Sequence, residues 1–233
     1  MKIKVVIPNS SVEFRNEAVD HRKQVAMEGT KVDVVSLPRG PVSMESFVDE
    51  AYASPYLLDE IKKAEQQGYD AVTIDCSGDA GLRAAKEITN IPVVGAGEAS
   101  RLLALALGDK FSIITVLPNA VDVIRERVIT SQMGDRCASV RSADVPVLEL
   151  KDYERAKAAT LRESKRAVEE DGADVIVLGC VGMAKIAEEI QKELGVPVVE
   201  PATAAIKVAE ALVQMKLSHS KRSFKTPPKK EIK

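Results

Sequence analysis

Short apolar runs alternate with longer amphipathic stretches along nearly the whole chain. The runs are rich in β-branched residues, which favours buried strands, and the stretches between them repeat apolar positions at helical spacing. Glycines stand where several of the helical stretches should stop, at Gly29, Gly68, Gly172 and Gly195. Alternation of strand and helix predicts an α/β fold with parallel sheets covered by helices on both faces.

The pattern gives bounds for each element. The predicted strands are Ile3–Ile7, Val32–Leu37, Ala71–Asp75, Pro92–Gly95, Phe111–Val116, Val175–Leu178 and Pro197–Val199. The predicted helices are Glu13–Gly29, Pro55–Gly68, Gly81–Ile88, Val121–Met133, Tyr153–Asp171 and Lys185–Leu194. No run approaches the ~18 apolar residues that cross a bilayer, so we expect no membrane partner.

The sequence also repeats itself. Residues 68–78 (Gly-Tyr-Asp-Ala-Val-Thr-Ile-Asp-Cys-Ser-Gly) match residues 172–182 (Gly-Ala-Asp-Val-Ile-Val-Leu-Gly-Cys-Val-Gly), which places Cys76 and Cys180 at the same point of two copies. Two further matches keep the same order: residues 91–94 with 196–199, and residues 6–9 with 116–119. Strand–helix units resemble one another in general, but that does not account for a Cys-x-Gly at the same point of both copies. We therefore predict two pseudo-symmetric lobes, each a mostly parallel sheet flanked by helices, with an active-site cleft between them.

The repeat also suggests how the chain is divided. We expect residues 1–97 together with 201–216 to form the first lobe and residues 98–200 to form the second. Residues 217–233 are rich in Lys and Arg and contain two prolines, which predicts a basic, flexible tail in solvent. A phosphate-binding role for this tail is the less expected alternative.

Composition narrows the class of protein. Hydrophobic residues make up 45% of the 233 and charged residues 29%, a balance typical of soluble globular proteins. The net charge of −2 gives no reason to expect a nucleic-acid partner. Three cysteines, without a visible secretion signal, predict reduced thiols in the cytoplasm. With two histidines and no Cys-x-x-Cys, we expect no metal site.

Cys76 and Cys180 each end a predicted strand, which is where parallel sheets bind their ligands. The start of the following helix should also favour a thiolate there. Two such thiols on opposite walls of one cleft suit the inversion of a carbon acid, which needs a base on one face and an acid on the other. An isolated free cysteine is more often a small buried hydrophobic residue, and we assign that role to Cys137, which lies outside the repeat.

Motifs spread from about Lys2 to about Val213 are similar to those of the hydantoin racemase group in the aspartate/glutamate racemase superfamily. They are Ile7-Pro8-Asn9-Ser10-Ser11, Gly40-Pro41-Val42-Ser43, Cys76-Ser77-Gly78-Asp79-Ala80-Gly81-Leu82, Pro92-Val93-Val94-Gly95, Arg136-Cys137-Ala138-Ser139-Val140-Arg141 and Leu178-Gly179-Cys180-Val181-Gly182-Met183.

This resemblance implies a homo-oligomeric racemase that uses no cofactor and takes Cys76 and Cys180 as its two catalytic bases. It further implies that the following residues surround a small-molecule substrate: Asn9, Ser10, Ser77, Gly78, Asp79, Thr115, Gly179, Val181 and Gly182. For Asp79, capping of the following helix is an equally good interpretation.

Two positions depart from the family pattern. Ser77 stands where the group usually has Phe, and Ala80 stands where it usually has Pro. A hydroxyl in place of a ring predicts a smaller and more polar pocket wall. The Cys-Asn-Thr and Gly-Cys-Thr motifs of the amino-acid racemases are absent, so the resemblance favours 5-substituted hydantoins or related neutral ureides such as allantoin.

Other functions fit parts of the sequence. One alternative is an aspartate or glutamate racemase of the same fold. Another is an isomerase or decarboxylase that uses a single cysteine, although such chemistry gives no reason for the paired Cys-x-Gly. A non-enzymatic alternative is a small-molecule binding module, because two α/β lobes around a cleft also describe binding proteins.

Overall fold

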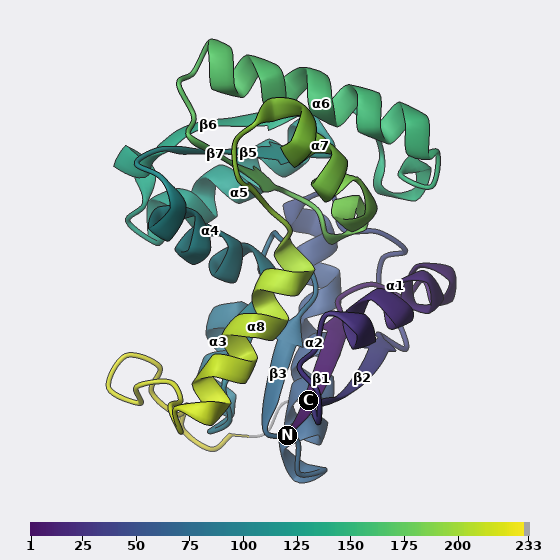
Figure 1. Ribbon diagram of the computed structural model, residues 1–233. Coiled ribbons are helices and arrows are strands. Elements are labelled where there is room, and N and C mark those ends of the chain that lie inside the picture. The colour runs from purple at the N-terminus through teal and green to yellow at the C-terminus, as the bar shows by residue number, and fades with distance from the viewer. Residues whose placement is uncertain (231–233) are drawn as a thin grey trace.

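The computed structural model describes residues 1–230, and in it the chain forms two lobes (Figure 1). Each lobe contains a four-stranded, fully parallel sheet, with strand orders β2-β1-β3-β4 and β6-β5-β7-β8. The first sheet consists of β1 (Lys2–Ile7), β2 (Lys31–Ser36), β3 (Ala71–Ile74) and β4 (Val93–Gly95). The second consists of β5 (Phe111–Thr115), β6 (Cys137–Ser142), β7 (Val175–Leu178) and β8 (Val198–Val199). The two sheets thus have the same strand order, as the sequence repeat predicts.

Helices cover both faces of each sheet. The first sheet packs against α2 (Phe47–Gln66) and α3 (Leu82–Ile88) on one face and against α1 (Val12–Gln24) and α8 (Pro201–Gln214) on the other. The second packs against α6 (Tyr153–Glu169) and α7 (Ala187–Leu194) on one face and against α4 (Ala96–Leu107) and α5 (Pro118–Thr130) on the other. Short 3-10 helices lie at Gly134–Arg136, Val147–Glu149 and Val181–Ile186. None of the helices within residues 1–230 is long and apolar enough to cross a membrane.

Two crossing helices join the lobes. Helix α4 leaves the first sheet and packs on the second, whereas α8 leaves the second sheet and runs back over the first (Figure 1). The two helices also pack against each other, and one apolar core includes residues of both sheets together with α4 and α8. Because this core is continuous, the two lobes are fixed relative to each other, and so are the strand ends that face across the cleft.

The predicted α/β fold is confirmed, but three elements were not predicted. Strand β6 is an edge strand whose residues are mostly half-buried and polar, so it lacks the apolar run of its neighbours. Helices α4 and α8 begin directly after β4 and β8, without a separate turn. At the β4–α4 and β8–α8 junctions the apolar residues of the strand run on into those of the helix, so the sequence pattern does not separate the two elements.

Within the predicted basic tail, the segment Ser218–Phe224 is half-buried or exposed and makes specific contacts with the first lobe. The N–H of Val93, at the start of β4, donates to Nε2 of His219 at 2.6 Å. Nζ of Lys221 donates to the carbonyl oxygens at the end of α3, including that of Lys86 at 2.9 Å. The basic residues therefore include ligands for the exposed carbonyl end of a helix, where cations are favoured. The prediction for residues 231–233 lies outside the described residues.

Candidate active site

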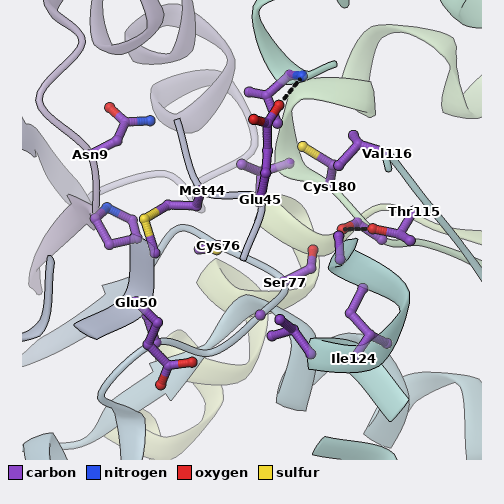
Figure 2. Close-up of a pocket in the computed structure, with 18 of the residues that line it drawn as sticks. Asn9, Met44, Glu45, Glu50, Cys76, Ser77, Thr115, Val116, Ile124 and Cys180 are labelled. Carbon is purple, nitrogen blue, oxygen red and sulfur yellow. Dashed lines mark hydrogen bonds between the residues drawn. The ribbon is translucent and has the colours of Figure 1, made fainter. Parts of the chain in front are cut away.

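Cys76 and Cys180 lie just beyond the carboxyl ends of β3 and β7, the equivalent strands of the two sheets. Both line one pocket between the lobes, which encloses about 640 Å³ including its mouth. Figure 2 shows this pocket, with Cys76 and Ser77 contributed by the first lobe and Cys180 and Thr115 by the second. The crevice beyond the strand ends is the usual ligand site of parallel sheets. The repeat thus brings two half-buried thiols to one ligand site.

The structure brings most of the predicted site residues together. Beside the two cysteines, the pocket is lined by Asn9, Ser77, Gly78, Thr115, Gly179 and Val181. The Thr115 hydroxyl donates to the carbonyl oxygen of Gly179 at 3.4 Å, a contact drawn in Figure 2. The Ser77 hydroxyl is buried and has no hydrogen-bond partner within residues 1–230. A buried polar group without a partner is costly, so Ser77 is the residue best prepared to bond a ligand.

Three predicted substrate contacts, at Ser10, Asp79 and Gly182, are not found in the pocket lining. The Ser10 hydroxyl donates to the carbonyl oxygens of Gly40 and Pro41 at 3.0 and 3.1 Å. Ser10 is therefore occupied in holding the loop that leads to the pocket mouth. Gly182 lies beside an adjoining hollow of about 1150 Å³ and contacts the sulfur of Cys180 instead.

Asp79 is buried and turned toward the start of α4, where it accepts from the N–H of Gly97 at 3.0 Å and from the Arg101 guanidinium at 2.9 Å. It therefore caps a helix, but one later in the chain than the helix expected. A side chain at Gly97 would come within 2.1 Å of the Ser77 carbonyl oxygen, and one at Gly95 within 2.1 Å of Asp79. Glycine at both positions lets the Cys76 loop pack directly on α4.

The two sulfurs have matching backbone partners. The N–H of Gly182 donates to Sγ of Cys180 at 3.4 Å, and the backbone N–H of Gly78 is the group that lowers the pKa of Cys76. Each bond stabilises the thiolate and lowers the pKa of its thiol. The repeated Cys-x-Gly is thus a repeated thiolate support.

Cys180 caps the 3-10 helix Val181–Ile186, as a helix start at the thiol would predict, but burial opposes the lowering of the thiol pKa. Burial is the largest influence, and it raises the pKa of Cys180 to about 11 and that of Cys76 further. Helix α3 begins only at Leu82, so its amino terminus is not adjacent to Cys76. In addition, a charge on Cys180 raises the pKa of Cys76. A single negative charge shared by the pair is therefore favoured over two.

Sequence reasoning missed one side of the pocket. Met44, Glu45, Ser46 and Glu50 come from the loop before α2 and from its first turn. The Gly40-Pro41-Val42-Ser43 motif directly precedes this segment and was the available signal. Glu45 reaches the other lobe, where its Oε1 accepts from the N–H of Val147 at 2.7 Å (Figure 2).

The remaining lining is largely apolar. It includes Phe14, Val116, Ala120, Val123, Ile124 and Val147. Three carboxylates, those of Glu45, Glu50 and Asp75, also reach the lining, whereas no Lys, Arg or His of residues 1–230 does. The pocket therefore suits a neutral ligand with N–H donors better than an anion.

The sequence model of the Asp/Glu/Hydantoin racemase family matches residues 3–209. The chain belongs to this family. It is 42% identical over 233 residues to a hydantoin racemase of a Pseudomonas species, a match that covers 99% of this chain and 94% of the relative. A hydantoin racemase of Paenarthrobacter aurescens is 39% identical and is matched over 99% of both chains. The resemblance inferred from the motifs is thereby confirmed.

A solved structure of this family has the same fold. The allantoin racemase of Pseudomonas fluorescens superposes with a TM-score of 0.95 at 37% identity, and the match covers 100% of both chains. The two-lobed architecture is therefore shared with a racemase over its full length.

Proposed function

We propose that this protein is a racemase that inverts the chiral carbon of a 5-substituted hydantoin or a related neutral ureide. Two thiols, Cys76 and Cys180, would transfer the proton. The observation that carries the proposal is that both thiols line one pocket from equivalent strand ends, each supported by the N–H of the glycine two residues later. Similarity to proteins named hydantoin racemase and allantoin racemase supports the same reaction class.

The chemistry needs one thiolate and one thiol. The thiolate removes the proton from C5 of the ring, and the electron pair moves into the neighbouring carbonyl to give an enolate. The opposite thiol then protonates C5 on its other face, so that the two sulfurs have exchanged their protonation states. Because the ionised thiol raises the pKa of its partner, the partner keeps the proton it must donate. The opposite enantiomer reacts by the same steps in reverse.

The lining of the pocket supports a ureide substrate. Ring N–H groups of a hydantoin are donors. The carboxylates of Glu45 and Glu50, which already accept from Val147 and Arg127, keep further lone pairs as acceptors, and the Ser77 hydroxyl has no partner within residues 1–230. The carboxylate of aspartate or glutamate would instead meet a lining without a cation in the part of the chain that the structure describes. The apolar walls suit a hydrocarbon substituent on C5.

The two thiols supply both proton transfers, so the proposed reaction requires neither a metal nor an organic cofactor. We further propose that the enzyme works as a homo-oligomer in the cytoplasm. The three cysteines of the chain are unpaired, which agrees with a reducing compartment.

The test is polarimetry over a panel of single-enantiomer 5-substituted hydantoins, allantoin, aspartate and glutamate, with chelator present and no pyridoxal phosphate added. We expect optical rotation to decay to zero for ureides and to stay constant for the amino acids. A malonate is assayed in parallel, and release of carbon dioxide from it would support the decarboxylase alternative. Ligand binding without loss of rotation for any compound would support a binding module and contradict the proposal.

A further inference from the structure

Arg22, in the last turn of α1, connects both thiol loops from within the protein. Its side chain is only 3% exposed. Nε and Nη2 donate to one carboxylate oxygen of Asp75 at 3.1 and 3.0 Å, and Nη2 also donates to the carbonyl oxygen of Val181 at 3.3 Å. Asp75 directly precedes Cys76, and Val181 directly follows Cys180. One guanidinium from the first lobe therefore holds the loop of the second lobe's thiol.

Arg127 makes the reciprocal contact from the second lobe. It lies in the last turn of α5, and its Nε donates to the carbonyl oxygen of Gly78 at 3.0 Å. Nη2 donates to the carboxylate of Glu50, which lines the pocket. Gly78 is the residue whose N–H supports the Cys76 sulfur. A guanidinium from the second lobe thus holds the loop of the first lobe's thiol.

The two contacts are of the same kind in the two lobes. Helices α1 and α5 each follow the first strand of their sheet, in sheets with the same strand order. Both arginines occupy the last turn of their helix, and both bond a backbone carbonyl one or two residues after a cysteine of the opposite lobe. The planar guanidinium can bond a carboxylate and a carbonyl at once, which an ammonium does less well.

We propose that Arg22 and Arg127 are positioning residues that clamp the two thiol loops across the lobe interface and so set the placement of each sulfur against the substrate carbon. This inference rests on the proposed two-thiol racemisation. Arg22 bonds both loops, and its bond to the Val181 carbonyl oxygen is the one that crosses to the Cys180 loop, whereas Arg127 bonds the Cys76 loop from the second lobe. Misplacement of a reacting group by about 1 Å can cost about a hundred-fold in rate, so loss of the cross-lobe carbonyl bond, with the ion pair kept, slows the transfer at one thiol selectively.

The informative variants are Arg22→Lys and Arg127→Lys. Lysine keeps the positive charge beside Asp75 or Glu50, which protects folding, but its compact ammonium does not reproduce the fork that reaches the second partner. Arg141→Lys is the matched control. Arg141 is partly enclosed and bonds Asp171 at 2.6 and 2.8 Å, but it bonds neither of the loops that carry Cys76 and Cys180.

Isotope effects separate the two clamps. Enantiomers have equal free energies in achiral solvent, so kcat/KM stays equal in both directions in every variant. Each Lys variant should lower kcat/KM about ten- to a hundred-fold. The primary effect of deuterium at C5 should rise for the enantiomer deprotonated by the loosened thiol and fall for its mirror image. Arg22→Lys and Arg127→Lys should show opposite asymmetries, and Arg141→Lys none.

A second readout needs no turnover. Alkylation by iodoacetamide, followed by mass spectrometry of the cysteine-containing peptides, should become several-fold faster at Cys180 in Arg22→Lys and at Cys76 in Arg127→Lys. If the wild type racemises no ureide, the proposed function fails while this measurement still tests the clamps. Alkylation that is unchanged in both variants, or isotope effects that shift for the same enantiomer, would overturn the inference. If one variant does not fold, the other carries the same test at its own thiol.

Discussion

The two-thiol mechanism makes a sharp prediction for Cys76→Ser and Cys180→Ser. Each thiol serves one face of the reacting carbon, so either change removes the base for one enantiomer and the acid for its mirror image. Racemisation should therefore fail in both directions in both variants. The surviving thiol still removes a proton from its own enantiomer and returns one to the same face. In deuterium oxide each variant should thus exchange the C5 proton of one enantiomer without inverting it.

The structure gives the scale of the loss. A thiol with a pKa of about 11, as at Cys180, is ionised in about one molecule in a thousand at pH 8. Forming the thiolate at that pH therefore costs ~4 kcal/mol of free energy. A serine hydroxyl ionises with far more difficulty, and general acid–base groups contribute ~10²–10⁴-fold. We expect kcat/KM to fall by about that factor in each single variant. The double variant should fall little further, because the two thiols act as a unit.

The assay combines polarimetry with proton NMR in deuterium oxide for each pure enantiomer. Cys76→Ser and Cys180→Ser should exchange opposite enantiomers, while Cys137→Ser, whose sulfur donates to the Ser139 carbonyl oxygen away from the pocket, should behave as wild type. The mechanism is refuted if both variants exchange the same enantiomer, or if either one racemises at a rate near that of the wild type.

Three further outcomes follow from the structure. Because burial raises the pKa of Cys180 to about 11, kcat/KM should rise about ten-fold per pH unit from pH 7 to 9, and a maximum near pH 7 in a pH–rate profile would contradict this. Ser77→Ala should raise KM about two- to ten-fold with kcat unchanged, since one hydrogen bond contributes ~0.5–1.5 kcal/mol; steady-state kinetics would show an altered kcat if Ser77 joins the chemistry. His219→Ala should remove the acceptor of the Val93 N–H at a cost of ~1–3 kcal/mol and lower Tm by about 3 to 10 °C, whereas the same change at the exposed Lys225 should leave calorimetric Tm unchanged.

The sequence was most informative where local pattern and chemistry coincide. Alternation of apolar runs and helical stretches predicted the parallel sheets, because strands buried on both faces must be continuously apolar. The repeat placed Cys76 and Cys180 at equivalent strand ends, and the pocket residues adjacent to them in sequence, such as Ser77 and Val181, followed directly.

Contacts between residues far apart in the chain were beyond the reach of pattern. Asp79 stands next to the cysteine motif, yet its partner Arg101 lies 22 residues later on α4. The same holds for Glu45, whose bond to Val147 spans 102 residues. Such pairings depend on how α4 and α8 cross between the lobes. The pKa of each thiol likewise depends on burial, which tertiary packing sets.

In the proposed racemase, the repeated residues and the residues that differ between the two copies have different roles. Enantiomers differ only in which face of C5 carries the proton, so two proton-transfer groups of matched pKa serve both directions without a large energy step. In the proposed mechanism Cys76 and Cys180 are these two groups, and they lie beyond equivalent strand ends, each with a cross-lobe arginine bonded to its loop. The ring itself, however, has two different edges and must be held in one orientation. The residues that directly follow the cysteines differ accordingly, because Ser77 has a hydroxyl without a partner within residues 1–230, while Val181 is apolar. The two equivalent sulfurs therefore suit proton transfer on both faces of C5, and the two different residues after them suit the binding of the ring in one orientation.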